Sequence, residues 1–317
     1  MINILANDGI SQSGKDALDN AGFNISTITV AQEQLANHIQ SNDIAVLLVR
    51  SATTVRKDLI DLCPNLKIIG RGGVGMDNID VEYARSKGIN VINTPAASSS
   101  SVAELVFAHL YGGVRFLHES NRNMPLEGDS NFKKLKKAYA KGVELRGKTI
   151  GIVGFGRIGR ETAKIALGIG MKVLAYDKFL KEASITLNFS HEKSVEFNIK
   201  ISKFNYLLEN SDFISLHVPA QKEFIIDKKQ FELMKDGVGI INAARGGVLN
   251  EVELISALDS GKVSFAGLDT FENEPKPEIK LLMHPNISLT PHIGAATNEA
   301  QDRIGKELAD QISNILN

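Results

Sequence analysis

The sequence predicts an α/β protein with two doubly wound parallel-sheet domains, one of them inserted into the other. Short apolar segments alternate with segments of helical periodicity along the 317 residues. This alternation is typical of parallel sheets covered by helices on both faces. A glycine-rich turn lies near the middle of the chain, between a predicted strand and a predicted helix. An amphipathic helix at the C-terminus can pack back on the first domain, which makes the glycine-rich domain an insertion.

Residues 1–97 and 290–317 form the first predicted domain, which has a flavodoxin-like sheet. Its strands and helices alternate without a glycine fingerprint for a dinucleotide. We therefore expect this domain to bind the substrate and not the pyrophosphate of a cofactor. Its predicted strands are 3–5, 25–29, 44–49, 66–69 and 89–92, and its predicted helices lie near 14–20, 33–40, 56–62 and 81–87.

Residues 98–289 form the inserted domain, for which the segment TIGIVGFGRIGRETAKIALGIGMKVLAYD at 149–177 predicts a Rossmann fold. Gly154, Gly156 and Gly159 give G-x-G-x-x-G where a strand turns into a helix. The first glycine permits the tight turn, the second lets the backbone approach a pyrophosphate, and the third lets the helix pack closely on the strand. The N-terminus of that helix would then face the phosphates.

Asp177 ends the second predicted strand of this domain, at 172–176. The fingerprint places a carboxylate there to hold the ribose hydroxyls of the cofactor. Because a carboxylate repels the additional phosphate of NADP, Asp177 favours NAD.

The remainder of the inserted domain is less uniform in pattern. Ser101 and Glu104 suggest a capping box at the start of one long helix in AASSSSVAELVFAHLYGGVRFLHES, residues 96–120. Residues 121–147 are polar and lysine-rich, as in a solvated face. Residues 178–203 are polar and resist assignment. Strands are predicted at 212–217, 238–242, 264–269 and 287–289, with helices near 228–234 and 251–260.

The C-terminal helix, which returns to the first domain, should bury one apolar stripe formed by Ala300, Ile304, Leu308, Ile312 and Ile315.

Composition narrows the class of protein. The formal charge of −1 gives no electrostatic footprint for nucleic acid or for an anionic membrane. The single cysteine, Cys63, cannot form an internal disulfide, which suits a reducing compartment. The N-terminus lacks a basic, apolar leader pattern. We therefore expect a cytoplasmic protein that acts on a small molecule and that binds neither membrane nor metal.

Two predicted strands of the first domain end in arginine. Arg50 lies in LLVRSAT and Arg71 in IIGRGGVGMDNID, at strand ends where open α/β sheets bind their ligands. Paired guanidinium groups suit a phosphate or a carboxylate, although two surface arginines are an alternative. Gly72 and Gly73 would allow the backbone to approach the ligand closely.

Three positions in the second half stand out by their context. Arg245 follows a predicted strand in NAARGGVLN, Glu274 lies in LDTFENEP, and His292 lies in SLTPHIGAAT. Arginine, carboxylate and imidazole near strand ends could together bind an acid and move a proton. Singly each has an ordinary structural explanation, and the spacing alone does not bring them together. His109 and the other histidines outside these segments have no functional context.

In order and nearly end to end, these segments resemble the D-isomer-specific 2-hydroxyacid dehydrogenases. The resemblance is carried by VGFGRIGRETA, SDFISLHVP, LMKDGVGIINAARGGVLNE, AGLDTFENEP and PNISLTPHIGAAT. Within that family, VRSAT, GRGGVGMDNIDVEYARSKGINVINTP and SSSSVAELVFAHL resemble most closely the phosphoglycerate dehydrogenases. The resemblance is to a short form, without the C-terminal regulatory domain that many of those enzymes carry.

The resemblance implies NAD-dependent oxidation of D-3-phosphoglycerate to 3-phosphohydroxypyruvate, the first step of serine synthesis. Arg245 would hold the substrate carboxylate and polarise the C2 oxygen. His292 would take the hydroxyl proton as hydride leaves C2, and Glu274 would pair with His292. Arg50, Ser51, Arg71, Gly72 and Gly73 would join Arg245 and His292 at the substrate.

The same resemblance implies the cofactor contacts and a homodimer formed through the cofactor domain. Asp269 would contact the nicotinamide carboxamide, and His217 would pack beside the adenine pocket. The implied NAD-binding residues are Val74, Gly154, Gly156, Arg157, Ile158, Gly159, Asp177, His217, Val218, Pro219, Ala243, Ala244, Arg245, Asp269, His292, Gly294 and Ala295.

Two other functions remain open from the sequence. A hydroxypyruvate or glyoxylate reductase of the same family would share the catalytic residues and would differ in its substrate. An NAD-sensing binding protein, similar to the corepressors that share this fold, would use dinucleotide occupancy to recruit peptide partners. The two strand-end arginines favour an acidic small molecule over a peptide.

Overall fold

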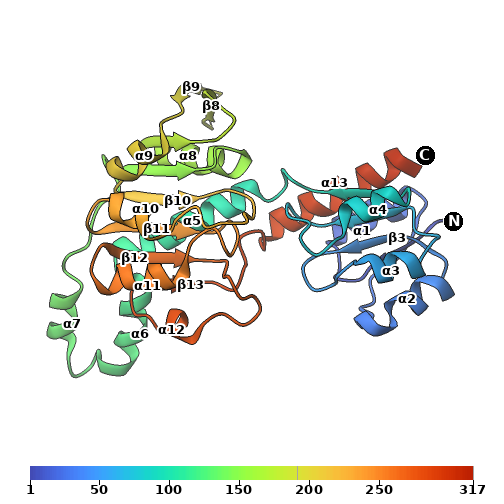
Figure 1. Ribbon diagram of the computed structural model, residues 1–317, viewed down its shortest axis with the longest axis horizontal. Coiled ribbons are helices and arrows are strands. Elements are labelled where there is room, and N and C mark those ends of the chain that lie inside the picture. The colour runs from blue at the N-terminus through green and yellow to red at the C-terminus, as the bar shows by residue number, and fades with distance from the viewer. Residues whose placement is uncertain (191, 317) are drawn as a thin grey trace. The chain divides into compact units, whose positions relative to one another are not determined.

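The computed structural model describes residues 1–190 and 192–316, which divide into two compact units (Figure 1). Unit 1 comprises Met1–Ser101 with Ala295–Asn317, and unit 2 comprises Val102–Gly294. The expected boundaries, after residues 97 and 289, fall a few residues earlier. Each unit contains its own parallel sheet, so the fold is α/β with two doubly wound domains, one inserted into the other.

Unit 1 contains a five-stranded sheet in the order β2-β1-β3-β4-β5. All of its strand pairs are parallel, and the order is that of flavodoxin-like folds. The strands are β1 Asn3–Ala6, β2 Asn24–Ser26, β3 Ile44–Val49, β4 Ile68–Arg71 and β5 Asn90–Asn93. The helices are α1 Gln12–Asn20, α2 Gln32–Ser41, α3 Lys57–Leu62, α4 Val81–Ser86 and the C-terminal α13 Asn298–Leu316.

Helix α13 packs on unit 1 through the predicted stripe, with one exception. Ala300, Ile304, Leu308 and Ile312 are buried, whereas Ile315 is 39% exposed. The prediction for Ile315 was therefore wrong, because Leu316 takes the core-facing position in the final turn of the helix.

Unit 2 contains a six-stranded parallel sheet in the order β13-β12-β11-β10-β6-β7. The strand order reverses between β6 and β10, and such a switch point is where open α/β sheets bind ligands at the carboxyl ends of their strands. The strands are β6 Thr149–Val153, β7 Lys172–Tyr176, β10 Phe213–Leu216, β11 Val238–Asn242, β12 Val263–Leu268 and β13 Ile287–Leu289.

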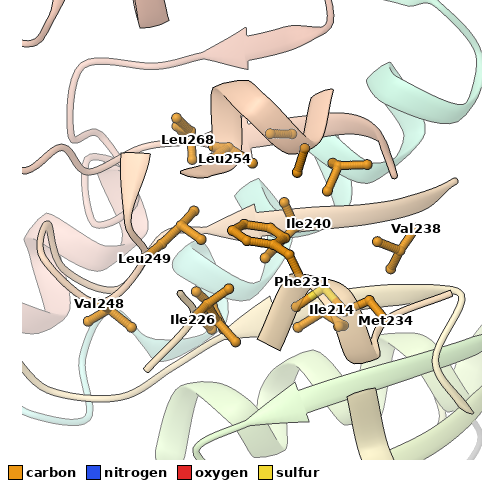
Figure 2. Close-up of a cluster of buried hydrophobic side chains, with 14 of the residues drawn as sticks. Ile214, Ile226, Phe231, Met234, Val238, Ile240, Val248, Leu249, Leu254 and Leu268 are labelled. Atoms are coloured by element: carbon orange, nitrogen blue, oxygen red, sulfur yellow. The ribbon is translucent and has the colours of Figure 1, made fainter. Parts of the chain in front are cut away.

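Alternate residues of these strands enter two apolar cores, one on each face of the sheet. Ile214 and Ile240 point into the first core, with Phe231, Val248 and Leu254 from the helices and loops that cover it (Figure 2). The helices of this unit are α6 Leu117–Glu127, α7 Phe132–Ala138, α8 Arg157–Gly168, α9 Phe204–Asn210, α10 Lys228–Leu233, α11 Glu251–Asp259 and α12 Ile279–Leu282. Helix α5, Ser99–Val114, begins in unit 1 and continues into unit 2.

The predicted capping box at Ser101 and Glu104 is wrong. Helix α5 already begins at Ser99, so Ser101 lies inside it. The Ser101 hydroxyl instead bonds to the Thr297 hydroxyl at 2.8 Å. The expected single long helix also ends at Val114, and Phe116 adopts a left-handed conformation before α6 begins.

The unassigned segment 178–203 forms a β-hairpin. Strands β8 (Glu182–Asn188) and β9 (Ser194–Lys200) pair antiparallel, and Figure 1 shows the hairpin extending beyond α8 and α9. At its base, Ile201 forms a single parallel bridge with Ala175 of β7. The hairpin thus occupies the place of the next Rossmann strand and covers part of the β7 edge, which would otherwise expose unpaired backbone groups.

Within the described residues, no helix is both long enough and apolar enough to span a lipid bilayer.

Candidate active site

The glycine turn after β6 has a separate physical reason for each glycine. Gly154 has φ +92°, and a Cβ there would lie 2.5 Å from the His217 carbonyl oxygen. A Cβ on Gly159 would lie 2.2 Å from the Gly154 carbonyl oxygen, which no side chain could accommodate. Around Gly156 nothing lies within 4 Å of the added atom. The first and third glycines therefore build the turn, and the second leaves open space above the backbone.

The open space at Gly156 lies at the start of a twelve-residue helix, α8, which begins at Arg157. The free N–H groups of a helix N-terminus and its dipole favour a negative group there. Arg157 is exposed at this end, and Ile158 is partly buried against the core. A turn with unfilled space over backbone N–H groups fits the pyrophosphate of a dinucleotide.

Asp177 lies one residue past the end of β7 and connects to the glycine turn. Its Oδ2 accepts a hydrogen bond from the Phe155 N–H at 2.9 Å, and its Oδ1 accepts from the Phe179 N–H at 2.9 Å. These bonds hold the carboxylate at the carboxyl edge of the sheet, beside the turn. This is the position that ribose recognition requires.

His217 follows β10 and packs against the glycine turn. Its Nε2 lies 2.9 Å from the Ser215 hydroxyl and 3.2 Å from the Thr162 hydroxyl. Burial lowers the pKa of His217 to about 3, so the ring is neutral at physiological pH. These contacts agree with the packing role expected for His217. Val218 beside it is half-buried, and Pro219 is exposed.

Arg245 is carried by the loop that follows β11. Asn242, the last residue of the strand, donates from its amide to the Arg245 carbonyl at 2.9 Å and accepts from the Ala244 N–H at 3.1 Å. Ala243 and Ala244, the first two residues of this loop, are buried. The guanidinium Nη1 donates to the Ala244 carbonyl at 2.7 Å. The backbone that presents Arg245 is therefore fixed from its own strand end.

His292 and Glu274 form the second part of the site. The His292 Nδ1 lies 2.8 Å from the Glu274 Oε2, and Glu274 Oε1 accepts from the Phe271 N–H at 3.0 Å. A carboxylate accepts hydrogen bonds, so the Nδ1 carries the proton and the Nε2 of His292 is left as the basic nitrogen. Both side chains are partly exposed, at 43% and 37%.

Glu274 is kept ionised by its neighbours. Burial is the largest influence and by itself would raise its pKa. The hydrogen bonds from His292 and Phe271, together with the charges of His292 and Arg245, outweigh burial and hold the pKa of Glu274 below its usual value. The charge of Arg245 therefore acts on the Glu274 carboxylate, and Arg245, Glu274 and His292 follow three adjacent strands of unit 2, β11, β12 and β13.

Asp269 holds the loop that carries His292. It follows β12 and is 1% exposed. Its Oδ1 accepts from the Thr290 hydroxyl at 2.6 Å and from the Ile293 N–H at 2.8 Å, and its Oδ2 accepts from the Gly294 N–H at 2.8 Å. His292 itself has φ +53°, a left-handed conformation that few residues adopt without support. The Asp269 carboxylate supplies that support, and its expected contact with a nicotinamide stays a prediction.

A pair of glutamates joins the arginine loop to the glutamate loop. The Glu251 Oε1 accepts from the Glu272 N–H, and the Glu272 Oε1 accepts from the Glu251 N–H, both at 2.8 Å. Burial is the largest influence on Glu251 and raises its pKa to about 7. The hydrogen bond from the Glu272 N–H lowers the pKa, whereas the charges of the neighbouring glutamates raise it further. A Cβ on Gly246 would lie 1.9 Å from the Phe271 carbonyl oxygen, so the two loops also touch directly.

In unit 1, Arg50 follows β3 and its backbone is fixed on both sides. Asp8 Oδ2 accepts from the Arg50 N–H at 2.6 Å, and the Asn78 amide donates to the Arg50 carbonyl at 2.8 Å. Asp8 also accepts from the Thr53 N–H and hydroxyl, at 3.1 and 2.6 Å. Ser51 is exposed beside it. Asp8 therefore determines how this strand end presents Arg50.

Arg71 ends β4, which pairs with β3 so that Val49 lies opposite Arg71. The two arginines thus lie on neighbouring strands at one edge of the sheet. Gly73 makes room for the guanidinium, because a Cβ there would lie 2.0 Å from Arg71 Nη1. Gly72 lies against the Arg50 side chain, because a Cβ on Gly72 would be 3.6 Å from the Arg50 Cγ. Val74 follows and is 36% exposed.

The sequence did not identify Asp8, Asn242, Glu251 or His109 as residues of the site. Asp8 and Asn242 could have been suspected, because each lies at the carboxyl end of a predicted strand. Glu251 had only its place after the arginine segment as a signal. His109 had none, because its partners lie in β13 and the segment after it, far away in the sequence.

Comparisons with known proteins agree with this site. Residues 107–294 match the D-isomer specific 2-hydroxyacid dehydrogenase, NAD binding domain. The D-3-phosphoglycerate dehydrogenase of Archaeoglobus fulgidus is 40% identical over 316 residues, which cover 98% of this chain and 57% of that protein. The hydroxypyruvate reductase of Thermotoga maritima is 45% identical over 275 residues, which cover 85% of this chain and 84% of that protein. The chain thus spans little more than half of the first relative.

Solved structures share the fold. The NAD-dependent formate dehydrogenase of Staphylococcus aureus, solved in complex with NAD, is 26% identical and has a TM-score of 0.78. The alignment covers 100% of this chain and 95% of that one. Together with the matched domain, this likeness gives NAD as the cofactor, in agreement with Gly156 and Asp177.

Alanine variants at two glycines of the turn should have different effects, one on cofactor binding and the other on the stability of the fold. Gly156→Ala places a methyl group where nothing in the protein lies but where the pyrophosphate should approach. We expect the Kd for NADH, measured by fluorescence titration, to rise about tenfold to a hundredfold, with unchanged thermal unfolding. Gly159→Ala instead meets backbone and should lower the free energy of unfolding by about 1–3 kcal/mol. An unchanged NADH affinity in Gly156→Ala would contradict the placement.

Glu251 predicts a dependence of stability on pH. An unfolded glutamate titrates near about 4.3, whereas the folded pKa is about 7. Between these values the folded state binds more protons than the unfolded state, so stability falls as pH rises and levels off above about 7. Glu251→Gln keeps an acceptor for the Glu272 N–H and removes this loss. The Tm of the variant relative to wild type should therefore increase from pH 5 to pH 8.

Glu253→Gln, on the same helix, serves as the control and should follow the wild-type Tm at every pH. Parallel Tm curves for wild type and Glu251→Gln would show that Glu251 does not titrate in this range.

Proposed function

Since the chain belongs to the D-isomer specific 2-hydroxyacid dehydrogenases, a family of NAD-dependent oxidoreductases, we propose that it oxidises D-3-phosphoglycerate at C2 to 3-phosphohydroxypyruvate. This is the first step of serine synthesis. The proposal is supported above all by Arg245, Glu274 and His292, which lie on loops after three neighbouring strands. The basic groups of Arg245 and His292 both help to keep Glu274 ionised. The relatives named D-3-phosphoglycerate dehydrogenase support the choice of substrate.

Arg245 would bind the substrate carboxylate through its guanidinium, since a planar fork matches the two oxygens of a carboxylate. The same group would polarise the C2 oxygen and stabilise charge that develops on it. The fixed backbone of the loop supports this role, because Asn242 holds the Arg245 carbonyl and the neighbouring N–H.

His292 would act as the general base. Its Nδ1–H is engaged by Glu274, so its Nε2 would take the proton of the C2 hydroxyl. Glu274 would orient the ring and stabilise the imidazolium that forms, as the third group does in other catalytic triads. NAD, when bound, supplies the hydride acceptor. The turn at Gly154, Gly156 and Gly159 would hold its pyrophosphate, and Asp177 its ribose.

The other expected cofactor contacts remain part of the proposal. In unit 2 they would come from Arg157 and Ile158 at the helix start and from the carboxyl edge of the sheet, and in unit 1 from Val74 and Ala295. The residues are Val74, Arg157, Ile158, His217, Val218, Pro219, Ala243, Ala244, Asp269, Gly294 and Ala295.

Unit 1 would bind the phosphate end of the substrate, through Arg50 and Arg71 with Ser51 and the backbone at Gly72 and Gly73. The register of β3 and β4 supports this assignment, because it places both cationic side chains on adjacent strand ends. A phosphate group accepts several charge-assisted hydrogen bonds, which two guanidinium groups can donate.

A homodimer formed through the cofactor domain, in the cytoplasm, completes the proposal. Leu117, Leu126 and Phe132 of α6 and α7 are large apolar side chains that are 62%, 77% and 56% exposed in the single chain. Large exposed apolar side chains on one surface region are typical of protein contacts, which supports an interface at these two helices. Sedimentation of the purified protein as a single chain would contradict the dimer.

A second candidate is hydroxypyruvate reduction within the same family. It is favoured by one observation: the Thermotoga maritima relative, at 45% identity, is named hydroxypyruvate reductase and is covered over 84% of its length. The catalytic residues would be shared, so only the substrate distinguishes the two functions.

A panel of 2-oxo acids with NADH tests the proposal. The wild-type protein should show the highest kcat/KM with 3-phosphohydroxypyruvate, ahead of hydroxypyruvate and glyoxylate. His292→Ala should lower kcat by about a hundredfold or more, while NADH binding survives. A preference for hydroxypyruvate or glyoxylate would select the second candidate, and no turnover of any 2-oxo acid would refute both.

Arg50→Ala tests the phosphate site. The KM for 3-phosphohydroxypyruvate should rise about tenfold to a hundredfold, since a hydrogen bond to a charged group contributes about 1.5–3 kcal/mol. The KM for hydroxypyruvate, which lacks the phosphate, should change little. Arg85→Ala, which removes an exposed arginine on α4, is the matched control. Equal increases for both substrates would place Arg50 away from the phosphate.

A further inference from the structure

A buried histidine lies behind the loop that carries His292. His109 of α5 is 3% exposed. Its Nδ1 lies 2.8 Å from the Ser288 hydroxyl on β13, and its Nε2 lies 3.0 Å from the Thr290 hydroxyl just after that strand. The glycine at position 267 makes this approach possible, because a Cβ there would lie 2.6 Å from the His109 Cβ.

The hydrogen bonds around His109 have one consistent direction. The Thr290 hydroxyl donates its only proton to Asp269 Oδ1, at 2.6 Å. Toward His109 it can therefore only accept, so the Nε2 of His109 carries a hydrogen. In a neutral ring the Nδ1 is then the acceptor, and the Ser288 hydroxyl donates to it.

The neutral ring follows from the surroundings of His109. Burial is the main influence and lowers its pKa. The charge of Asp269 acts in the opposite direction, and the charge of His118 adds to the lowering. A neutral His109 donates to Thr290 alone, which fixes both the tautomer and the orientation of the Thr290 hydroxyl.

The chain of hydrogen bonds ends at the backbone on either side of the catalytic histidine. Asp269 receives the Thr290 hydroxyl and the N–H groups of Ile293 and Gly294, directly after His292. His292 also donates its own N–H to the Thr290 carbonyl at 3.1 Å. Thr290 and Asp269 therefore hold the left-handed turn at His292 from both sides.

From this geometry we propose that His109 is a positioning residue for the reaction, acting through Thr290 and Asp269 to fix the loop that presents His292. The inference rests on the proposed function, because it assigns His292 the proton transfer. His109 touches neither substrate nor cofactor in this role. A small displacement of a reacting group can lower a rate by about a hundredfold, which is the scale of the effect that such support could have.

Paired variants at two positions test the inference. His109→Leu removes the N–H that donates to Thr290, and Thr290→Val removes the hydroxyl that links His109 to Asp269. In contrast, His109→Gln keeps an N–H donor within reach of Thr290, and Thr290→Ser keeps the hydroxyl. We expect kcat to fall about tenfold to a hundredfold in the first pair, with KM changed much less, and to stay within about threefold of wild type in the second pair. His38→Leu, on α2 of unit 1, is the matched histidine control.

A second measurement does not depend on turnover. Hydrogen exchange of the Ile293 and Gly294 amides should be faster in His109→Leu than in wild type, and close to wild type in His109→Gln. If His109→Leu is too unstable to purify, Thr290→Val and Thr290→Ser carry the same comparison.

The outcomes separate the two proposals. A wild-type protein that turns over no 2-oxo acid refutes the proposed function. An active wild type whose kcat and amide exchange are unchanged in His109→Leu and Thr290→Val refutes the positioning role alone. Equal loss in His109→Leu and His109→Gln also refutes it, because the hydrogen bond would then not be what matters.

Discussion

Parallel pairing of the strands in unit 2 brings all of their carboxyl ends to one edge of the sheet, and the candidate site depends on that constraint. The glycine turn follows β6, Asp177 follows β7, Arg245 follows β11 and His292 follows β13. Residues separated by more than a hundred positions thus lie at one edge of the same sheet without any long loop. The same edge contains the reversal of strand order, where backbone N–H groups and a helix N-terminus are free to meet a ligand.

Loops at this edge are held by side chains that take up their backbone groups. Asn242 holds the loop of Arg245, Asp269 holds the loop of His292, and Glu251 and Glu272 bind each other's N–H groups between α11 and the loop of Glu274. A buried N–H without a hydrogen-bond partner would lower the stability of the fold, and these polar side chains supply the missing partners. Because they also fix where the candidate catalytic groups lie, the same bonds preorganise the candidate site.

In unit 1, too, polar side chains hold the backbone at the carboxyl ends of the strands, but the residues presented there are different. Its carboxyl edge has arginines in place of a glycine turn, and Asp8 and Asn78 hold the backbone of Arg50 as Asn242 holds that of Arg245. A doubly wound sheet therefore supplies a rigid edge in both units, and the residues at the strand ends decide what each edge can bind. In unit 1 these are cationic groups suited to an anion, and in unit 2 they are a glycine turn suited to a dinucleotide and the proposed proton-transfer pair.

The sequence by itself determined the features that depend on neighbouring residues. Apolar periodicity located most strands and helices, G-x-G-x-x-G located the glycine turn between β6 and α8, and Asp177 lies at the strand end where the sequence placed it. Only the tertiary structure decided features whose partners are distant. Ser101 bonds to Thr297 instead of capping a helix, the base of the hairpin at 178–203 pairs with β7, and His109 contacts Thr290. Such contacts depend on how sheets and helices pack, which local patterns do not encode.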